Sequence, residues 1–125
     1  MWSYEQSTGN LSHNSVYVAQ GYSGADEGKN NPTMQSVHNI GPIPCGVYAI
    51  GTPFNSIDHG PFVMHLWPDA ANRMFGRVGF LMHGDSIEHP GCASKGCIIM
   101  PHIVRKQVAD SGDRELWVIS PGISP

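Results

Sequence analysis

Short hydrophobic runs separated by turn-forming residues dominate the chain. Runs rich in β-branched and aromatic residues, bounded by Gly, Asn, Pro or Ser, predict β-strands. The predicted strands cover residues 2–5, 11–13, 16–19, 47–50, 61–67, 80–82 and 116–119. Tight turns join the first three strands, so an antiparallel meander is expected near the N-terminus.

One segment has the spacing of an α-helix. Its apolar residues recur at i, i+3, i+4 and i+8 and are Met100, Ile103, Val104 and Val108. This spacing places them on one helical face. Pro101 suits a first turn and Ser111-Gly112 a stop, which together predict a helix of about three turns.

Residues 22–45 lack apolar periodicity and contain several glycines and prolines. A loop of this length inside a compact domain is more often functional than idle. We therefore expect it to form the wall or lid of a cleft. The whole pattern predicts a mainly β fold, a barrel or sandwich with one main helix.

Composition narrows the possible functions. A length of 125 residues fits one domain, expected to span residues 1–125, and 40% hydrophobic with 14% charged residues argues against disorder. Seven Lys and Arg without a basic run, and a net charge of −3, argue against a nucleic-acid partner. No apolar stretch approaches the roughly 18 residues of a membrane-spanning helix.

The first ten residues contain no apolar run of the kind that a secretory signal peptide needs. We therefore expect a chain made in the cytoplasm that either stays there or leaves by a route that does not read such a peptide.

Three cysteines cannot all pair within one chain. The odd count fits one reactive thiol with at most one disulfide, for which Cys45 and Cys92 are one option.

The segment from residue 80 to residue 100 carries the candidate chemistry. His83 ends an apolar strand, and Cys97 precedes the predicted helix. Cysteine catalysis needs a thiolate, and a helix N-terminus or a neighbouring imidazolium favours one. The intervening loop is long enough to return His83 to Cys97. We therefore predict Cys97 as nucleophile and His83 as general base, although most cysteines are inert packing residues.

Four neighbours of this pair have expected supporting roles. Gly96 lets the backbone approach a substrate, and the amides around it are candidate oxyanion donors. Ser94 is expected to organise the turn, and Gly84 follows the predicted base. Asp85 either orients the histidine or, as the stronger alternative, forms a turn.

The residues His83-Gly84, with Ser94-x-Gly96-Cys97 fourteen residues after the histidine, resemble the signature of the YkuD-like L,D-transpeptidases. More closely, the chain resembles the L,D-transpeptidase-type effectors that bacteria deliver into rivals by type VI secretion. The other segments that carry this resemblance are residues 6–9, 21–24, 29–32, 41–44, 74–77 and 111–114.

This resemblance implies a YkuD-like β-sandwich or barrel that acts on peptidoglycan stem peptides. Cys97 would cleave the bond between diaminopimelate and the terminal D-alanine, and the acyl group would pass to water, a D-amino acid or another stem. The family further implies a cognate immunity protein, a component of the secretion apparatus as partner, and action in the periplasm of target cells. We expect no cofactor and no bound metal.

Two positions depart from the wider family. Lys95 stands where histidine is usual, and Ile99 where arginine is common. A lysine still brings positive charge close to a thiolate or a substrate carboxylate. The candidate side chains for binding substrate carboxylates are Arg73, Arg77, Lys95 and Arg105.

Three alternative hypotheses about the function remain. A tetrahedral zinc set would use His83, His89, Cys92 and Cys97, whose spacing follows no recognised zinc pattern. A housekeeping cross-linking enzyme and a non-catalytic wall-binding module are further alternatives. The three tryptophans are expected in the core rather than as sugar-stacking platforms: Trp2, Trp67 and Trp117.

Overall fold

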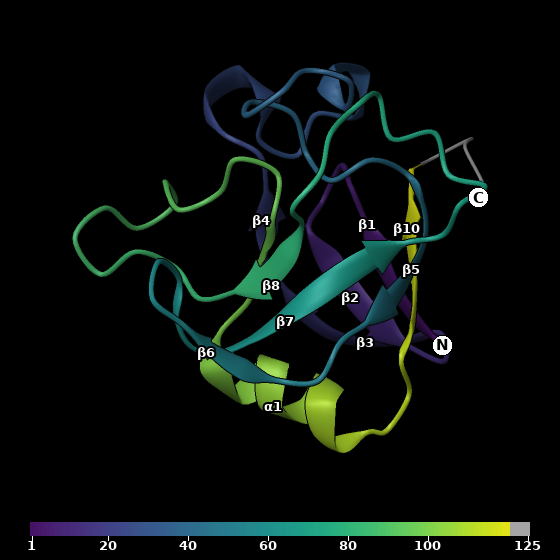
Figure 1. The fold of residues 1–125 in the computed structure, drawn as a ribbon, viewed down its shortest axis with the longest axis vertical. Coiled ribbons are helices and arrows are strands. Elements are labelled where there is room, and N and C mark those ends of the chain that lie inside the picture. The colour runs from purple at the N-terminus through teal and green to yellow at the C-terminus, as the bar shows by residue number, and fades with distance from the viewer. Residues whose placement is uncertain (121–125) are drawn as a thin grey trace.

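A strongly curved sheet of ten short strands wraps around one hydrophobic core in the computed structural model, which describes residues 1–120 (Figure 1). The strand order is β3-β2-β1-β10-β5-β7-β8-β9-β4, and β6 pairs with β7. The bounds are β1 (Trp2–Glu5), β2 (Asn10–His13), β3 (Val16–Gln20), β4 (Tyr22–Ser23), β5 (Gly46–Ile50), β6 (Phe54–Ser56), β7 (Gly60–Pro68), β8 (Leu81–His83), β9 (Ile98–Ile99) and β10 (Glu115–Ile119). The prediction of a mainly β, barrel-like fold with one helix is confirmed.

The sheet joins the two ends of the described chain. β1, β2 and β3 form the predicted antiparallel meander. β1 also pairs in parallel with β10, with Trp2 opposite Leu116. β10 then pairs antiparallel with β5, so the meander is joined to the strands that follow the long loop.

Alternation along β7 explains which face of the sheet is buried. Met64 and Leu66 are almost fully buried, whereas His65 is half-buried and Trp67 exposed. Because successive strand side chains point to opposite faces, the first pair fills the core and the second lies on the outer face. The largest buried side chains of the core include Tyr4, Leu11, Tyr48, Met64, Leu66, Met82, Ile98 and Leu116.

The only α-helix of the described chain, α1 (His102–Asp110), covers one end of the sheet beside β7 and β8 (Figure 1). Val104 and Val108 are buried against the core, as the helical spacing predicts. Ile103 is 70% exposed, so its predicted place on the buried face is wrong. This helix is too short to cross a membrane, and no other helix in residues 1–120 could do so.

Three short strands were not predicted, namely β4, β6 and β9. β4 and β9 have two residues each and pair with one another, so neither shows a period in the sequence. β9 matters for the chemistry because it lies between Cys97 and α1. Cys97 is therefore not at the helix N-terminus, and the expected effect of the helix dipole on its thiol has no structural basis.

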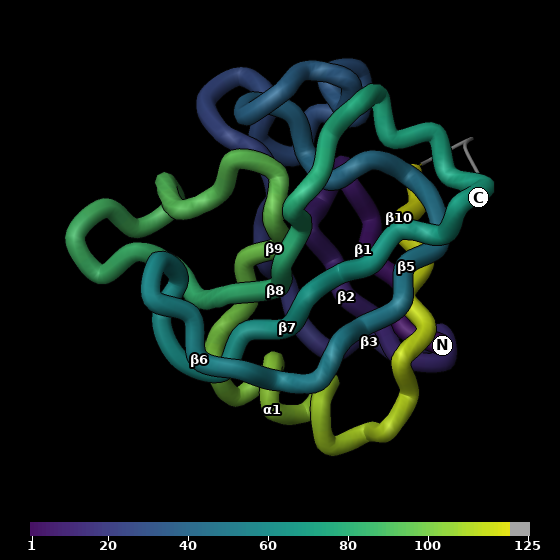
Figure 2. The backbone as a smooth tube through the Cα atoms, viewed as in Figure 1, coloured from purple at the N-terminus to yellow at the C-terminus, as the bar shows by residue number. Residues whose placement is uncertain are grey.

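The long loop is anchored by polar contacts. It contains two short 3₁₀ helices, η1 (Asp26–Gly28) and η2 (Pro32–Met34). Ile43 donates its amide to Ser23, and the buried Gln6 side chain donates to the Ile43 carbonyl. Figure 2 shows this loop at one end of the molecule beside the segment that leads into β8. A contact between His38 and the Phe75 carbonyl joins the two at 3.0 Å.

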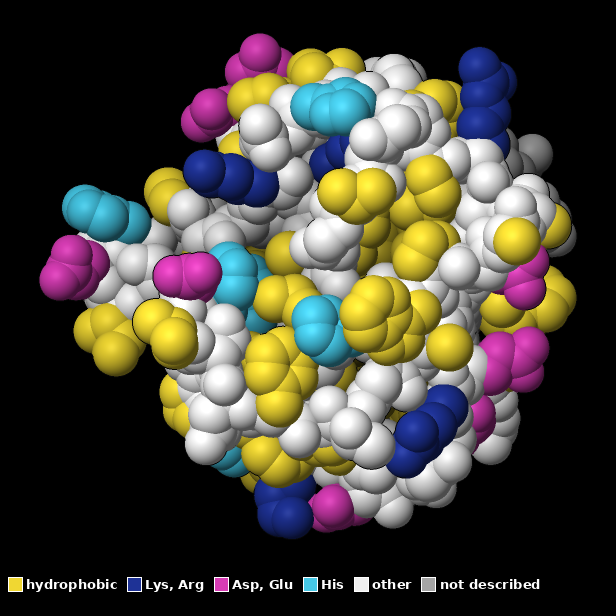
Figure 3. All heavy atoms as spheres, viewed as in Figure 1, with side chains coloured by type: hydrophobic (Ala, Val, Ile, Leu, Met, Phe, Trp, Pro, Cys, Tyr) yellow, Lys and Arg dark blue, Asp and Glu magenta, His cyan; other side chains and the backbone are white. Residues whose placement is uncertain are grey.

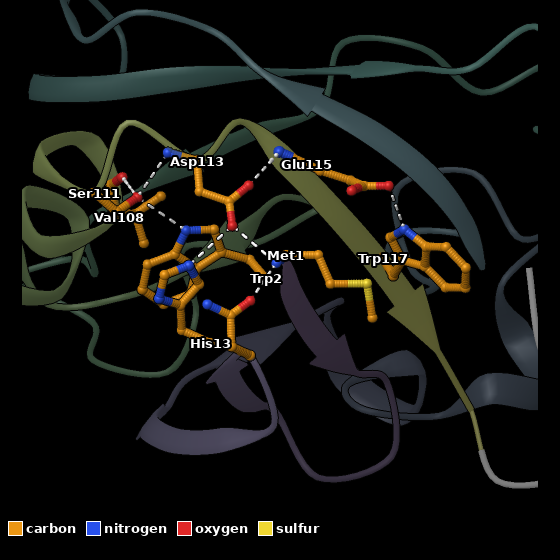
Figure 4. A network of polar contacts seen from close by, with 9 residues as sticks. Met1, Trp2, His13, Val108, Ser111, Asp113, Glu115 and Trp117 are labelled. Carbon is orange, nitrogen blue, oxygen red and sulfur yellow. Dashed lines mark hydrogen bonds and ion pairs between the residues drawn. The ribbon is translucent and has the colours of Figure 1, made fainter.

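A polar cluster ties the meander to the turn after α1 (Figure 4). Asp113 Oδ2 lies 2.8 Å from the amino group of Met1 and 2.9 Å from His13 Nε2. Trp2 stacks on His13 and donates its indole N–H to Ser111 Oγ. The amino group and His13 hold the pKa of Asp113 down at about 2.

Candidate active site

β8 and β9 bring His83 and Cys97 to one pocket. The two strands pair in parallel, with Met82 opposite Ile98 in the core. Alternation then puts the neighbours of these residues, His83 and Cys97, on the outer face of the sheet. Both residues line a pocket of about 540 Å³.

The pocket walls come from segments that are distant in sequence. The long loop contributes residues 38–39, the turn between β6 and β7 residues 58–59, and the segment before β8 residues 76–80. Residues 93 and 95–97 complete the lining. The long loop therefore forms one wall of the cleft, which is one of the two roles expected for it from the sequence.

The Cys97 thiol lies against the start of β8. Its sulfur accepts the Leu81 amide at 3.3 Å, and its S–H is directed to the Gly79 carbonyl at 3.9 Å. Burial raises the pKa of Cys97, while the Leu81 amide and the positive charge of Arg77 oppose that rise. The thiol is therefore protonated at neutral pH until a base takes its proton.

His83 is 3% exposed, and its Nδ1 lies 2.8 Å from the Gly84 carbonyl oxygen. A carbonyl only accepts, so Nδ1 carries the proton and Nε2 of the neutral ring is left as an acceptor. Burial lowers the pKa of His83; the bond to Gly84 opposes this, and the charge of His59 adds to it. At neutral pH the ring is uncharged and able to take a proton.

No hydrogen bond joins Cys97 and His83 within residues 1–120. The thiol contacts the backbone of Leu81 and Gly79, and the imidazole contacts that of Gly84, while both side chains line the same pocket. Catalytic hydrogen bonds are often long before substrate is bound and tighten in the complex. The resting pair is a neutral thiol beside a neutral imidazole.

His59 is a site residue that sequence reasoning missed. It lies in the turn between β6 and β7, is exposed, and stacks on His83 with centroids 4.5 Å apart. Together with Asp58 it also lines the pocket. The segment Asp58-His59-Gly60 has only the composition of a turn, and the fold alone brings it to His83.

Ser94 holds the turn before Cys97. Its hydroxyl accepts the amides of Gly24 and Gly96 and donates to the Cys97 carbonyl at 2.7 Å. The Gly96 amide is thereby occupied, which differs from its expected role as an oxyanion donor. The Cys97 amide has no acceptor in the described part of the chain, so it is the remaining donor at this position.

Gly96 is required for a close approach. Its φ is +134°, and a Cβ at this position would lie 2.5 Å from Arg77 Nη2. Any side chain would meet a guanidinium that is itself held on several sides. The turn therefore needs glycine for both its backbone conformation and its space.

Arg77 lies 4% exposed, and its guanidinium donates to four backbone carbonyls. The acceptors are those of Gln35, Gly41, Pro42 and Lys95. Arg77 thus joins the long loop to the turn before Cys97. Its expected role in binding a substrate carboxylate is replaced by a structural one, because its donors are already engaged.

The other three cationic residues predicted to bind substrate differ in their contacts and in whether they line the pocket. Arg105 donates to the carbonyls of Met100, Pro61 and Phe62, so it ties α1 to β7 rather than facing substrate. Arg73 is exposed, lies over the ring of Phe75, and is not part of the pocket lining. Lys95 is exposed and lines the pocket.

Asp85 does not contact His83. Its carboxylate accepts the Tyr22 hydroxyl at 2.6 Å and the amides of Ser86 and Gly91. These bonds close the turn after β8. Asp85 is therefore the turn-forming residue of the two alternatives, and the Gly84 carbonyl orients the histidine instead.

All three cysteines are free thiols, so Cys45 and Cys92 form no disulfide. Cys45 donates to Gln6 Oε1, and burial raises its pKa to about 11. Cys92 is exposed. The zinc alternative finds no support, because no three His, Cys, Asp or Glu residues within residues 1–120 converge as metal ligands.

The fold and site define a mainly β protein with a buried histidine and a cysteine at one pocket. The model of the Tlde1 domain matches residues 17–120, and the chain belongs to this family of type VI secretion effectors. The resemblance to secreted effectors seen in the sequence is thereby confirmed. The chain matches no curated protein and no solved structure.

Proposed function

We propose that the chain is an antibacterial cysteine enzyme that cleaves the bond between diaminopimelate and the terminal D-alanine of peptidoglycan tetrapeptide stems. It would act as an L,D-carboxypeptidase, a D-amino-acid exchange enzyme, or both. One observation carries the proposal: a free thiol lines one pocket together with a neutral imidazole whose Nε2 has no hydrogen-bond partner within residues 1–120. Membership of the effector family supports the biological setting.

The geometry supports a general-base mechanism. His83 Nε2 takes the thiol proton while Cys97 Sγ attacks the peptide carbonyl, and the Cys97 amide donates to the oxyanion. When the tetrahedral intermediate collapses, the C–N bond breaks and D-alanine leaves with the proton from His83. A thioester then joins the stem to Cys97.

The second half repeats these steps with an acceptor. Water or the amine of a D-amino acid gives a proton to His83 and attacks the thioester carbonyl. The C–S bond breaks, and the proton returns to the Cys97 sulfur. Water yields a tripeptide stem, whereas an amine yields an exchanged stem.

Lys95 is the cation available at this pocket. The terminal carboxylate of the leaving D-alanine needs a positive partner, and the arginines nearby are committed to backbone carbonyls. Lys95 is exposed at the pocket lining and free to move toward that carboxylate.

The proposed setting is delivery into a rival cell and action in its periplasm. A producing cell then needs an immunity protein, and the pocket that holds both His83 and Cys97 is the surface at which such a partner would block turnover. Contact with a component of the secretion apparatus is part of the same proposal.

Mass spectrometry of disaccharide-tetrapeptide incubated with the protein, with and without D-methionine, tests the function. We expect loss of one D-alanine, or its replacement by D-methionine. Cys97→Ala should abolish both reactions, while Cys92→Ala, which removes an exposed thiol, should retain them. Unchanged muropeptides with a folded wild-type protein would contradict the proposed reaction.

A further inference from the structure

A shallow depression lies on the outer face of β10, β5 and β7. Glu115 stands opposite Ala49, and Ala49 opposite Trp67. Residues directly opposite in antiparallel strands share a face, so the small Ala49 side chain lies between two larger ones. The resulting depression has a volume of about 460 Å³ and is also bordered by Pro68, Asp69 and Arg114.

Trp67 forms one wall of this depression. It is 56% exposed, so its predicted place in the core is wrong. One face of its indole stacks on His65, with centroids 4.4 Å apart, and His65 in turn stacks on Phe54. The three stacked rings form a row in which Trp67 is the last member, so the second face of its indole is not covered by the stack.

The indole N–H of Trp67 has no acceptor within residues 1–120. The other two tryptophans differ, because Trp2 donates to Ser111 Oγ and Trp117 to Glu115 Oε2. A tryptophan placed only for packing usually satisfies this donor. Trp67 offers an aromatic face together with a free donor.

Polar groups border the aromatic wall. One Glu115 oxygen holds Trp117, as Figure 4 shows, and one Asp69 oxygen holds the Ala71 amide. Each carboxylate keeps its other oxygen as an acceptor, and Arg114 is exposed beside them. An aromatic face with acceptors and donors of mixed charge suits a neutral polyhydroxylated ring rather than a polyanion.

The depression and the pocket lie on the same side of the sheet. His65, next to Trp67 in the row, stands opposite Leu81, whose amide holds the Cys97 thiol. Figure 3 shows histidine and hydrophobic side chains side by side across the middle of this face. A ligand lying across β7 and β8 would therefore reach both regions.

We propose that the depression formed by Trp67, Ala49 and Glu115 binds sugar rings of a polysaccharide. The apolar face of a ring would stack on Trp67, and its hydroxyls would bond to Glu115, Asp69 and the indole N–H. As a substrate subsite, this inference rests on the proposed function: it holds the glycan whose attached stem enters the pocket. Sugar binding itself does not require turnover.

Binding is tested by NMR, following the indole N–H signals during titration with an N-acetylglucosamine tetramer. We expect a saturable shift of the Trp67 signal in the wild type, and a similar affinity in Tyr17→Ala, which removes an exposed aromatic on β3. Trp67→Ala should lose binding. Ala49→Arg fills the exposed depression while keeping Trp67, and should weaken binding at least tenfold.

Absence of any shift at millimolar tetramer, or unchanged affinity in Ala49→Arg, would overturn the inference. Turnover separates it from the proposed function. Trp67→Ala should raise KM for disaccharide-tetrapeptide about tenfold and leave KM for the free tetrapeptide unchanged. Sugar binding without any turnover would contradict only the proposed reaction. Turnover without sugar binding would contradict only the proposed sugar subsite.

Discussion

The imidazole of His59 stacks on that of His83, with ring centroids 4.5 Å apart and 29° between their planes. This contact covers the predicted base, and the charge of His59 lowers the pKa of His83 in addition to the larger effect of burial. A residue in the turn between β6 and β7 therefore lowers the pKa of His83, which lies at the end of β8.

Substitution of His59 should move the acidic limb of the activity profile. Burial and a positive neighbour both disfavour the imidazolium, so their removal raises the pKa of His83. In His59→Ala the midpoint of kcat/KM against pH should move to higher pH, because both effects weaken. His59→Phe keeps the stack and should move it less. An acidic limb that stays in place, or moves to lower pH, would show that His59 does not act on His83.

Loss of Arg77 should destabilise the fold. Four backbone carbonyls would lose a buried charged donor, and each unpaired group carries a desolvation cost. We expect Arg77→Met to lower the free energy of unfolding by about 3 kcal/mol or more in urea titrations. Arg73→Met, at an exposed position, should change it by less than about 0.5 kcal/mol. Equal effects of the two substitutions would argue against the structural role of Arg77.

A side chain at position 96 should damage the site. In Gly96→Ala the new Cβ would meet Arg77 at 2.5 Å in a backbone conformation that favours glycine. We expect a loss of turnover together with lower thermal stability. Gly112→Ala is the matched control, since φ is +70° there and nothing lies within 4 Å of the new Cβ. Its cost should be confined to about 1 kcal/mol of backbone strain, with turnover retained.

Acid should weaken the fold through Asp113. Its pKa is about 2 in the folded state, below the usual value, so the folded state binds protons less readily than the unfolded chain. This contribution is complete above about pH 4 and is lost as pH falls toward 2. Asp113→Asn should be less stable than the wild type at pH 6, and the difference should shrink by pH 2. A difference that stays constant between these pH values would assign the effect to something other than ionisation.

The sequence predicts those strands and the helix that have a regular spacing of hydrophobic residues. Alternating hydrophobic residues mark β1, β5, β7 and β10, and the spacing of Val104 and Val108 marks α1. The motif around Cys97 identifies the candidate nucleophile because its residues are neighbours in the sequence and can be recognised without the structure.

Tertiary contacts decide the features that the sequence does not predict. Arg77 has the same local appearance as a surface arginine, and only the fold brings it to its four carbonyls, three from the long loop and one from Lys95. His59 gains its partner through the pairing of β6 with β7. Trp67 is exposed because the strand register puts it on the outer face. None of these facts has a signal within a few residues of the side chain concerned.

The most direct test of the account is a search for the thioester on Cys97. The protein is mixed with disaccharide-tetrapeptide, quenched in acid, and measured by intact-protein mass spectrometry and then by peptide mapping. The account predicts an added mass equal to the substrate minus D-alanine, located on Cys97 and absent in Cys97→Ala. Release of D-alanine with the adduct on Cys45 or Cys92, or without any adduct in rapid-quench samples, would contradict it.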